Sequence, residues 1–209
     1  MSERTRPTYR HGDLRRALLA AAFELAREGG PEAVVLREAT RRVGVVPTAA
    51  YRHFADRRTL LASVCDAAQA ALADAIEDEQ ATALVDADSS AAAMAAFKAV
   101  GTGYVRFARY EPGLFRTAFS VPDDLGGRGD AARSGRTGRT PFQLLSDALD
   151  QLVRTGALSA PRRDGAEFLA WSAVHGLSTL AVDGPLRALG DDQVHSVAAR
   201  LVQMVADGL

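Results

Sequence analysis

Arginines and short side chains form the most distinctive chemical pattern in the sequence. Residues 36–54 read LREATRRVGVVPTAAYRHF. Arginine binds phosphate oxygens, and short residues at the start of a helix can approach base edges in the major groove of DNA. Residues 1–58 contain 12 arginines and 7 acidic residues, a charge of +5, whereas residues 59–209 carry −6. This asymmetry indicates a nucleic-acid-binding surface near the N-terminus, with an ordinary fluctuation of surface charge as the alternative.

The residues available for catalysis or metal binding are few. The chain has one cysteine, Cys65, and four histidines, His11, His53, His175 and His195. It lacks a G-x-S-x-G elbow, a P-loop, a dinucleotide fingerprint and an H-E-x-x-H pair. A single cysteine also excludes an intrachain disulfide framework and a Cys-rich zinc site. The sequence therefore predicts a protein that is not an enzyme and that uses no cofactor or metal.

The elements that position these residues are expected to be helices, because no segment shows convincing alternation of apolar and polar residues. Leu14, Leu18, Ala22 and Leu25 form one apolar stripe that ends before Gly29-Gly30-Pro31. Further helices are expected at about 36–43, 47–53, 57–79, 90–110, 114–119, 141–154, 166–182 and 194–205. The sequence thus predicts an all-α fold with about nine helices.

The breaks between these helices carry their own signals. Gly44 is expected to end one helix in the left-handed conformation, and Asp56 is expected to cap the long helix that follows. Thr140 and Pro141 make an N-cap and first-turn pair. Residues 121–139 read VPDDLGGRGDAARSGRTGR, with five glycines, four arginines and almost no apolar residue. That composition predicts a flexible loop.

The two short helices around Gly44 have the pattern of a helix-turn-helix. Ala39, Val43, Val45 and Ala50 can pack these helices against each other and against the first helix. Glycine at the turn permits the close approach. Many helical hairpins share this spacing, so a helical hairpin without DNA binding is the alternative.

Four separated segments resemble the TetR (tetracycline-repressor) family. Residues 9–30 and the continuous stretch made up of 36–54 and 54–64 (the last reading FADRRTLLASV) are similar to its DNA-binding domain. GYVRFARYEPGLFRTAF at 103–119 and WSAVHG at 171–176 resemble the C-terminal domain of the subgroup named for its Trp-His-Gly (WHG) positions. These segments occur in the family's order and cover most of the chain.

The resemblance implies an N-terminal three-helix helix-turn-helix DNA-binding domain with its arm over 1–56, and a C-terminal helical effector-binding and dimerisation bundle over 57–209. Family members are homodimers whose third helices enter successive major grooves of double-stranded operator DNA. The residues expected to contact DNA are Arg37, Pro47, Thr48, Ala49, Tyr51, Arg52, His53, Arg57 and Arg58. The arm residues Arg4, Arg6, Tyr9 and Arg10 are expected to follow the backbone or enter a minor groove. A solvated surface charge is the alternative for each arginine.

The sequence departs from the family pattern at three positions. Val35 and Val46 stand where the family usually places serine or threonine at the caps of helices 2 and 3. Each replacement loses a side-chain acceptor, at a cost of about 1 kcal/mol. Thr40 replaces a small alanine in helix 2, which predicts slightly looser packing. We therefore expect a DNA-binding domain less stable than in relatives.

The last two helices have broad apolar faces, and in this family such faces pair with their symmetry mates. Ala173, Gly176 and Thr179 would permit close approach. The candidate effector-binding residues are Phe97, Tyr104, Phe107, Phe115, Phe119, Trp171 and His175. Core packing is the alternative for each of them, above all for His175. The scarcity of buried charge predicts a small, apolar or weakly polar effector.

The predicted function is that of a one-component transcriptional regulator, a repressor released from an inverted-repeat operator by a small molecule. The alternatives are an activator, or a dimeric DNA-binding protein without an effector. The N-terminus has no apolar signal core, and no uncharged apolar run reaches the roughly 18–20 residues of a membrane helix. We therefore expect a cytoplasmic protein without a membrane partner.

Overall fold

A computed structural model describes residues 11–83, 89–121 and 130–209. Over these ranges the chain forms ten α-helices and two short 3-10 helices, and no strand. In chain order they are α1 (His11–Gly29), η1 (Pro31–Ala33), α2 (Leu36–Val43), α3 (Pro47–Ala50), α4 (Arg57–Ala83), α5 (Ser90–Tyr110), α6 (Pro112–Ala118), α7 (Asp130–Arg133), α8 (Pro141–Arg154), η2 (Ala160–Arg162), α9 (Ala166–Val182) and α10 (Asp191–Gly208). The all-α prediction is confirmed.

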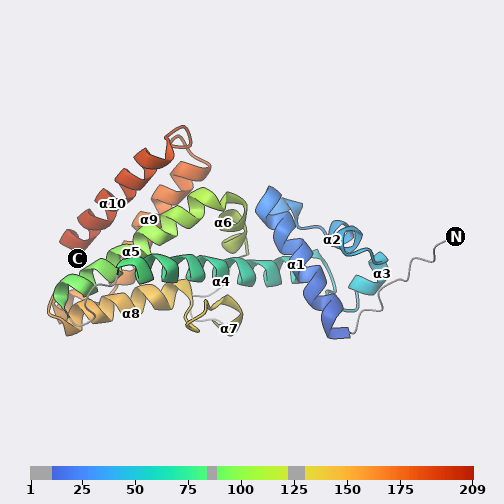
Figure 1. Cartoon of the computed structure of the whole chain (residues 1–209), viewed down its shortest axis with the longest axis horizontal. Helices are drawn as coiled ribbons and strands as arrows, with labels where there is room; N and C mark the ends of the chain where they lie inside the picture. The colour runs from blue at the N-terminus through green and yellow to red at the C-terminus, as the bar shows by residue number, and fades with distance from the viewer. Residues whose placement is uncertain (1–10, 84–88, 122–129) are drawn as a thin grey trace.

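The molecule is elongated, with α1–α3 at one end and the larger bundle of α5–α10 at the other (Figure 1). Helix α4 begins beside α1 and continues through the bundle, so that it belongs to both parts. Asp56 caps this helix, since its Oδ1 accepts a hydrogen bond from the Thr59 amide at 2.7 Å. The cap expected from the sequence is therefore present.

The small N-terminal domain is built on the apolar stripe of α1. Leu18 and Ala22 are fully buried, and Leu14 and Leu25 are nearly so. Phe54, just beyond α3, is also fully buried, and the Arg15 guanidinium lies 4.5 Å from its ring centroid. Helices α2 and α3 pack against α1 along this stripe.

Helix α5 is the centre of the larger bundle, because it packs against α4, α6, α8, α9 and α10. Ser89 caps its start and Thr140 caps α8, where a reciprocal capping box forms with Gln143. The segment Arg57–Thr82 of α4 is long and apolar enough to cross a membrane, but it packs against α1, α5, α6, α7 and α8 as a core helix does.

Two elements differ from the sequence prediction. Helix α3 ends at Ala50, and residues 51–53 form a turn instead of completing a helix to His53. Within the segment expected to be a flexible loop, residues 130–133 form α7, a helix that is not among the nine expected from the sequence. Arg133 and Arg136 bind acidic residues of α4 there, so ion pairs hold this polar segment in place. Residues 122–129 of that segment lie outside the described residues.

Candidate DNA-binding surface and effector cavity

The turn between α2 and α3 depends on Gly44. Its φ of 77° lies in the left-handed region that glycine adopts without strain. Its amide donates to the carbonyls of Thr40 and Arg41, and the Val45 amide also donates to Thr40. These bonds close the end of α2 and direct the chain into α3, as the sequence predicted.

The starts of α2 and α3 have no side-chain cap. Val35 and Val46 occupy the N-cap positions, and neither side chain accepts a hydrogen bond. Thr40 is buried in α2, and its hydroxyl donates to the Arg37 carbonyl at 2.7 Å. The hydroxyl that threonine adds is thus satisfied inside the helix.

The outer side of α3 is the candidate DNA-contacting surface. Pro47, Thr48, Tyr51 and Arg52 are exposed, while Ala49 is half-buried. His53 is also half-buried, and its carbonyl accepts a hydrogen bond from Arg15. The arm residues Arg4, Arg6, Tyr9 and Arg10 lie outside the described part of the chain.

The arginines predicted to bind phosphate fall into two groups. Over the described ranges, the exposed side chains of Arg37 and Arg52 make no ion pair or hydrogen bond. Arg58 is exposed at the start of α4. Arg57 instead bonds the carbonyls of Val34 and Pro31 at 2.9 and 2.6 Å. Those bonds give Arg57 a structural role, because they hold η1 against the start of α4.

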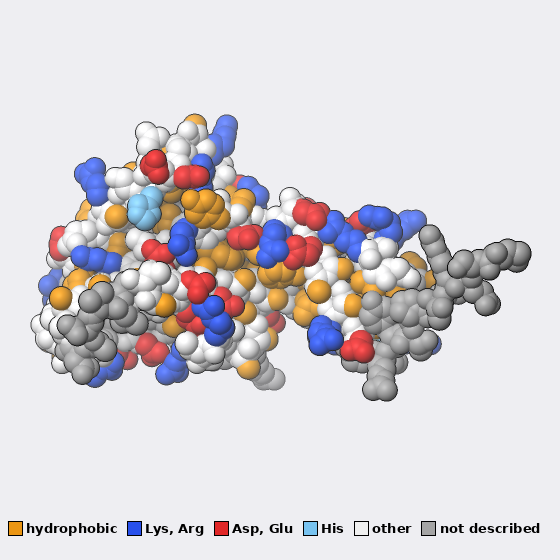
Figure 2. Space-filling view, viewed as in Figure 1, with side chains coloured by type: hydrophobic (Ala, Val, Ile, Leu, Met, Phe, Trp, Pro, Cys, Tyr) orange, Lys and Arg blue, Asp and Glu red, His pale blue; other side chains and the backbone are white. Residues whose placement is uncertain are grey.

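Several other arginines of this domain are neutralised internally. Arg42 binds Glu28 across α1 and α2, and Arg41 binds Glu38 one turn before it. The hydrogen bond from Arg42 holds the pKa of Glu28 below its ordinary value. Figure 2 shows basic and acidic side chains interleaved over this part of the molecule. The charge available to DNA is therefore smaller than the count of arginines suggests.

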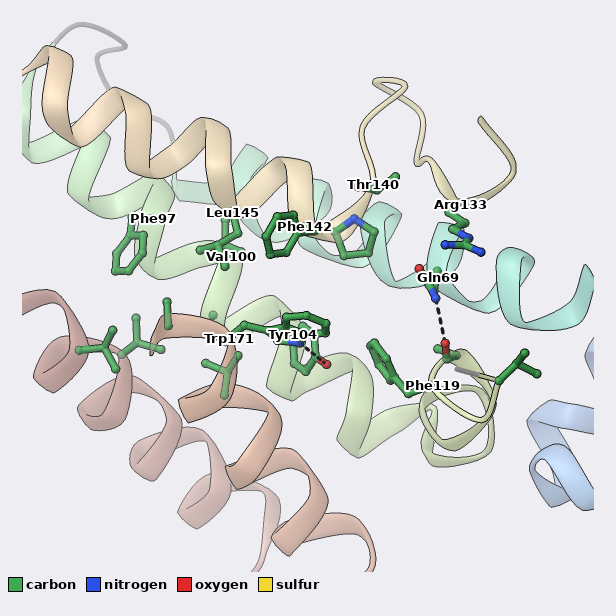
Figure 3. A pocket seen from close by; sticks show the side chains of 18 residues that line it. Gln69, Phe97, Val100, Tyr104, Phe119, Arg133, Thr140, Phe142, Leu145 and Trp171 are labelled. Carbon is green, nitrogen blue, oxygen red and sulfur yellow. Dashed lines mark hydrogen bonds between the residues drawn. The ribbon is translucent and has the colours of Figure 1, made fainter. Parts of the chain in front are cut away.

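The bundle contains a partly open cavity of about 260 Å³ between α5, α8, α9 and α10 (Figure 3). Its walls are mostly apolar and aromatic. Of the predicted effector residues, Phe97, Tyr104, Phe119 and Trp171 line it. The other three, Phe107, Phe115 and His175, do not line this cavity. Phe107 and Phe115 are buried, and His175 lies behind Tyr104.

A hydrogen-bonded network joins two residues that line the cavity to His175, which does not line it. Trp171 Nε1 donates to Tyr104 Oη at 3.2 Å, and Tyr104 Oη lies 2.8 Å from His175 Nδ1. Burial raises the pKa of the Tyr104 hydroxyl and lowers the pKa of the His175 imidazole. These shifts favour a protonated Tyr104 hydroxyl beside a neutral His175 imidazole, and the two hydrogen bonds tie the three rings together.

Several lining residues could not be found from the sequence. Phe142 and Thr140 come from the start of α8, Gln69 from α4 and Arg133 from α7. The polar groups gather at one end, where Figure 3 shows Gln69 and Arg133 together and away from Phe97. Arg133 pairs with Asp66 at 2.8 Å, and Gln69 donates to the Ala118 carbonyl at 3.0 Å. The charge of Arg133 is thereby balanced within the wall.

Helix α6 connects the cavity to the N-terminal domain. Ala118 and Phe119, at its end, line the cavity. At its start, a Cβ on Gly113 would overlap the carbonyl oxygens of Ala26 and Arg27 at the end of α1. Glycine is therefore needed for this close contact, which an ion pair between Arg27 and Glu111 at 3.0 Å reinforces.

Helices α9 and α10 leave apolar side chains uncovered on the bundle. Leu169 and Leu180 on α9 are 64% and 44% exposed, and Met204 on α10 is 63% exposed. Leu169, Ala173, Gly176 and Leu180 follow helical spacing on one face of α9. A continuous apolar face of this kind marks an interaction surface.

Comparison with known proteins matches both parts of the chain. Residues 18–64 match the family described as bacterial regulatory proteins, tetR family, and residues 97–205 match the tetracyclin repressor-like C-terminal domain. No curated protein matches the chain.

Solved structures share the fold over nearly the whole length. A protein of unknown function from Rhodococcus sp. RHA1 is 26% identical, with a TM-score of 0.73 over 98% of this chain and 99% of that one. A TetR-family transcriptional regulator from Pectobacterium atrosepticum is 21% identical, with a TM-score of 0.67 over 99% and 97% of the two chains. One from Marinobacter aquaeolei VT8 is 16% identical, with a TM-score of 0.61 over 92% and 94%. With its helix-turn-helix end and its helical bundle both matched, the chain belongs to the TetR family of DNA-binding transcriptional regulators.

Proposed function

We propose that this chain is a homodimeric repressor that leaves an inverted-repeat operator when a small apolar effector enters the bundle cavity. The observation that carries the proposal is the path along α6. Phe119 at its end forms part of the cavity wall, and Gly113 at its start contacts the backbone of α1. An occupant that displaces Phe119 acts on the DNA-binding domain through one short helix.

The proposed dimer uses the uncovered apolar face of α9 and α10. Isologous pairing of these helices would bury Leu169, Leu180 and Met204 in a four-helix arrangement. Gly176 has open space around its Cα, which leaves room for a partner helix. We expect a solution mass of twice the 22.1 kDa of one chain. Light scattering that gives a single-chain mass at micromolar concentration contradicts the dimer.

The chemistry of the cavity supports an uncharged effector. The polar groups of Trp171, Gln69 and Arg133 already have partners within the protein, so a charged ligand would have to break an existing pair. The remaining surface is apolar, with aromatic rings from Phe97 and Phe142. The alternative of a dimer without an effector would fit a filled bundle better than one with this cavity.

Two finer assignments accompany the proposal. We assign the chain to the WHG subgroup, and the support is that Trp171 and His175 meet through Tyr104 while Gly176 lies beside them on α9. We also assign it to the cytoplasm, where a regulator reaches its operator.

The test uses the single tryptophan of the chain, Trp171, which lines the cavity. Uncharged aromatic compounds are titrated while Trp171 emission is followed, and the same compounds are added to the protein bound to labelled DNA from upstream of its own gene. We expect compounds that change the emission to lower the DNA affinity as well. Compounds that occupy the cavity without any change in DNA affinity would overturn the effector mechanism.

A cavity-filling variant sharpens the test. Val100 on α5 is buried and lines the cavity, so Val100→Phe should block the effector response while DNA binding stays. Ala91→Phe places the same ring at the exposed start of α5 and is the matched control, with a normal response.

A further inference from the structure

The start of α3 is unusually poor in polar side chains for a surface that meets base edges. Val46, Pro47, Thr48 and Ala49 occupy it, and we call these four residues the α3 tip. Thr48 carries the only polar side-chain group of the tip. Side chains that discriminate bases by paired hydrogen bonds, such as arginine, asparagine and glutamine, are absent from these four positions.

The valine of the tip is displayed to solvent. Val46 is 65% exposed, and its side chain makes no capping bond. Pro47 is also exposed and has no amide hydrogen to offer. An exposed apolar side chain contributes hydrophobic free energy only when it is buried against another surface.

Only one base presents an apolar group in the major groove. Thymine carries its C5-methyl there, whereas the edges of adenine, guanine and cytosine offer donors and acceptors. A valine pressed against a polar edge would leave those groups without partners. The α3 tip is therefore chemically complementary to thymine.

We infer that each operator half-site carries a thymine opposite Val46, and that burial of its C5-methyl group against the α3 tip contributes to sequence discrimination. This inference rests on the proposed DNA-binding function. Arg52 is exposed beyond the end of α3 and makes no ion pair with any described residue, so it supplies the polar contact next to this apolar one.

The experiment begins with selection of duplexes from a random library by the full-length protein. Each thymine of the enriched site is then replaced by deoxyuridine, which removes only the C5-methyl group, and affinity is measured by fluorescence anisotropy. At one position in each half-site we expect a loss of about fourfold, and about 15-fold when both half-sites are changed. Thymines elsewhere should tolerate the replacement.

Two serine variants make a matched pair. Val46→Ser removes the apolar contact and adds a helix cap, so the domain stays folded and should bind the thymine and uracil sites equally. Val35→Ser makes the same change at the start of α2 and should keep the wild-type sensitivity to uracil.

The possible results distinguish failure of the thymine contact from failure of the proposed DNA-binding function. Specific binding that is unaffected by uracil at every position, or sensitivity that persists in Val46→Ser, overturns the thymine contact and leaves the regulator intact. A selection that enriches no sequence overturns both.

Discussion

The helix starts of the two regions are built in different ways. In the DNA-binding domain, the N-cap positions of α2 and α3 are Val35 and Val46, whose side chains accept no hydrogen bond. In the bundle, Ser89 and Thr140 are the N-caps of α5 and α8, and both side chains accept a backbone hydrogen bond, whereas the N-cap residues of α6, α9 and α10 make no such bond. The difference indicates that packing on α1 and ion pairs hold α2 and α3, whereas local capping bonds also fix the starts of α5 and α8.

The largest effect on stability is expected at the contact between the two regions, where α6 packs against α1. Gly113→Ala places a methyl group against the carbonyls of Ala26 and Arg27, which cannot move without unwinding the end of α1. We expect the free energy of unfolding to fall by about 2–3 kcal/mol, as in overpacked sites. Thermal unfolding should separate into two transitions, one for each region.

The control for this change is Gly208→Ala, where a Cβ meets open space at the end of α10. If Gly113→Ala melts at the same temperature as Gly208→Ala, in one transition, the tight contact between α6 and α1 does not join the regions.

A second test measures how the stability of the bundle depends on pH. Burial lowers the pKa of His175 below its ordinary value of 6.5. Below about pH 6.5 the unfolded state therefore binds more protons than the folded state, and the free energy of unfolding should decrease as the pH falls toward the lowered pKa. A protonated Nδ1 of His175 could no longer accept a hydrogen bond from the Tyr104 hydroxyl.

Denaturant unfolding between pH 8 and pH 5 measures this effect. His175→Gln should flatten the profile, and His195→Gln, at an exposed position of α10, should keep the wild-type shape. Identical profiles for all three proteins would show that His175 does not link the bundle to pH.

The smallest expected effect concerns the caps themselves. Val35→Ser should stabilise α2 by about 0.5–1 kcal/mol, and Thr140→Ala should destabilise α8 by about 1 kcal/mol. Hydrogen exchange reports both, because the amides of α2 and α3 should exchange faster than those of α8 in the unmodified protein. Equal protection of α2, α3 and α8 would remove the contrast between the regions.

Local signals explain the parts of the fold that the sequence predicts. The apolar spacing of α1, the left-handed Gly44 and the caps at Asp56 and Thr140 all act within a few residues, so one segment contains the whole pattern. The starts and ends of the long helices follow from these signals. The family resemblance adds the order in which the helices are arranged.

The parts that the sequence does not predict depend on partners far along the chain. Helix α7 is held in place because Arg133 and Arg136 form ion pairs with Asp66 and Asp78 on α4. The polar, glycine-rich composition of residues 121–139 does not indicate that these partners exist. Arg57 gives the same lesson, since its bonds to Pro31 and Val34 exist only after η1 has folded beside it. Gln69 and Phe142 likewise come to line one cavity only in the folded bundle.

The length of α4 has a mechanical consequence. Its 27 residues run from the DNA-binding domain through the bundle as one unbroken rod, about 40 Å long at the usual rise of an α-helix. A rod of that length acts as a lever, and a tilt of about 5° at one end displaces the other by about 3.5 Å, close to the rise of one base pair along DNA. A tilt of α4 by a few degrees would therefore displace the DNA-binding domain by a distance comparable with one base-pair step.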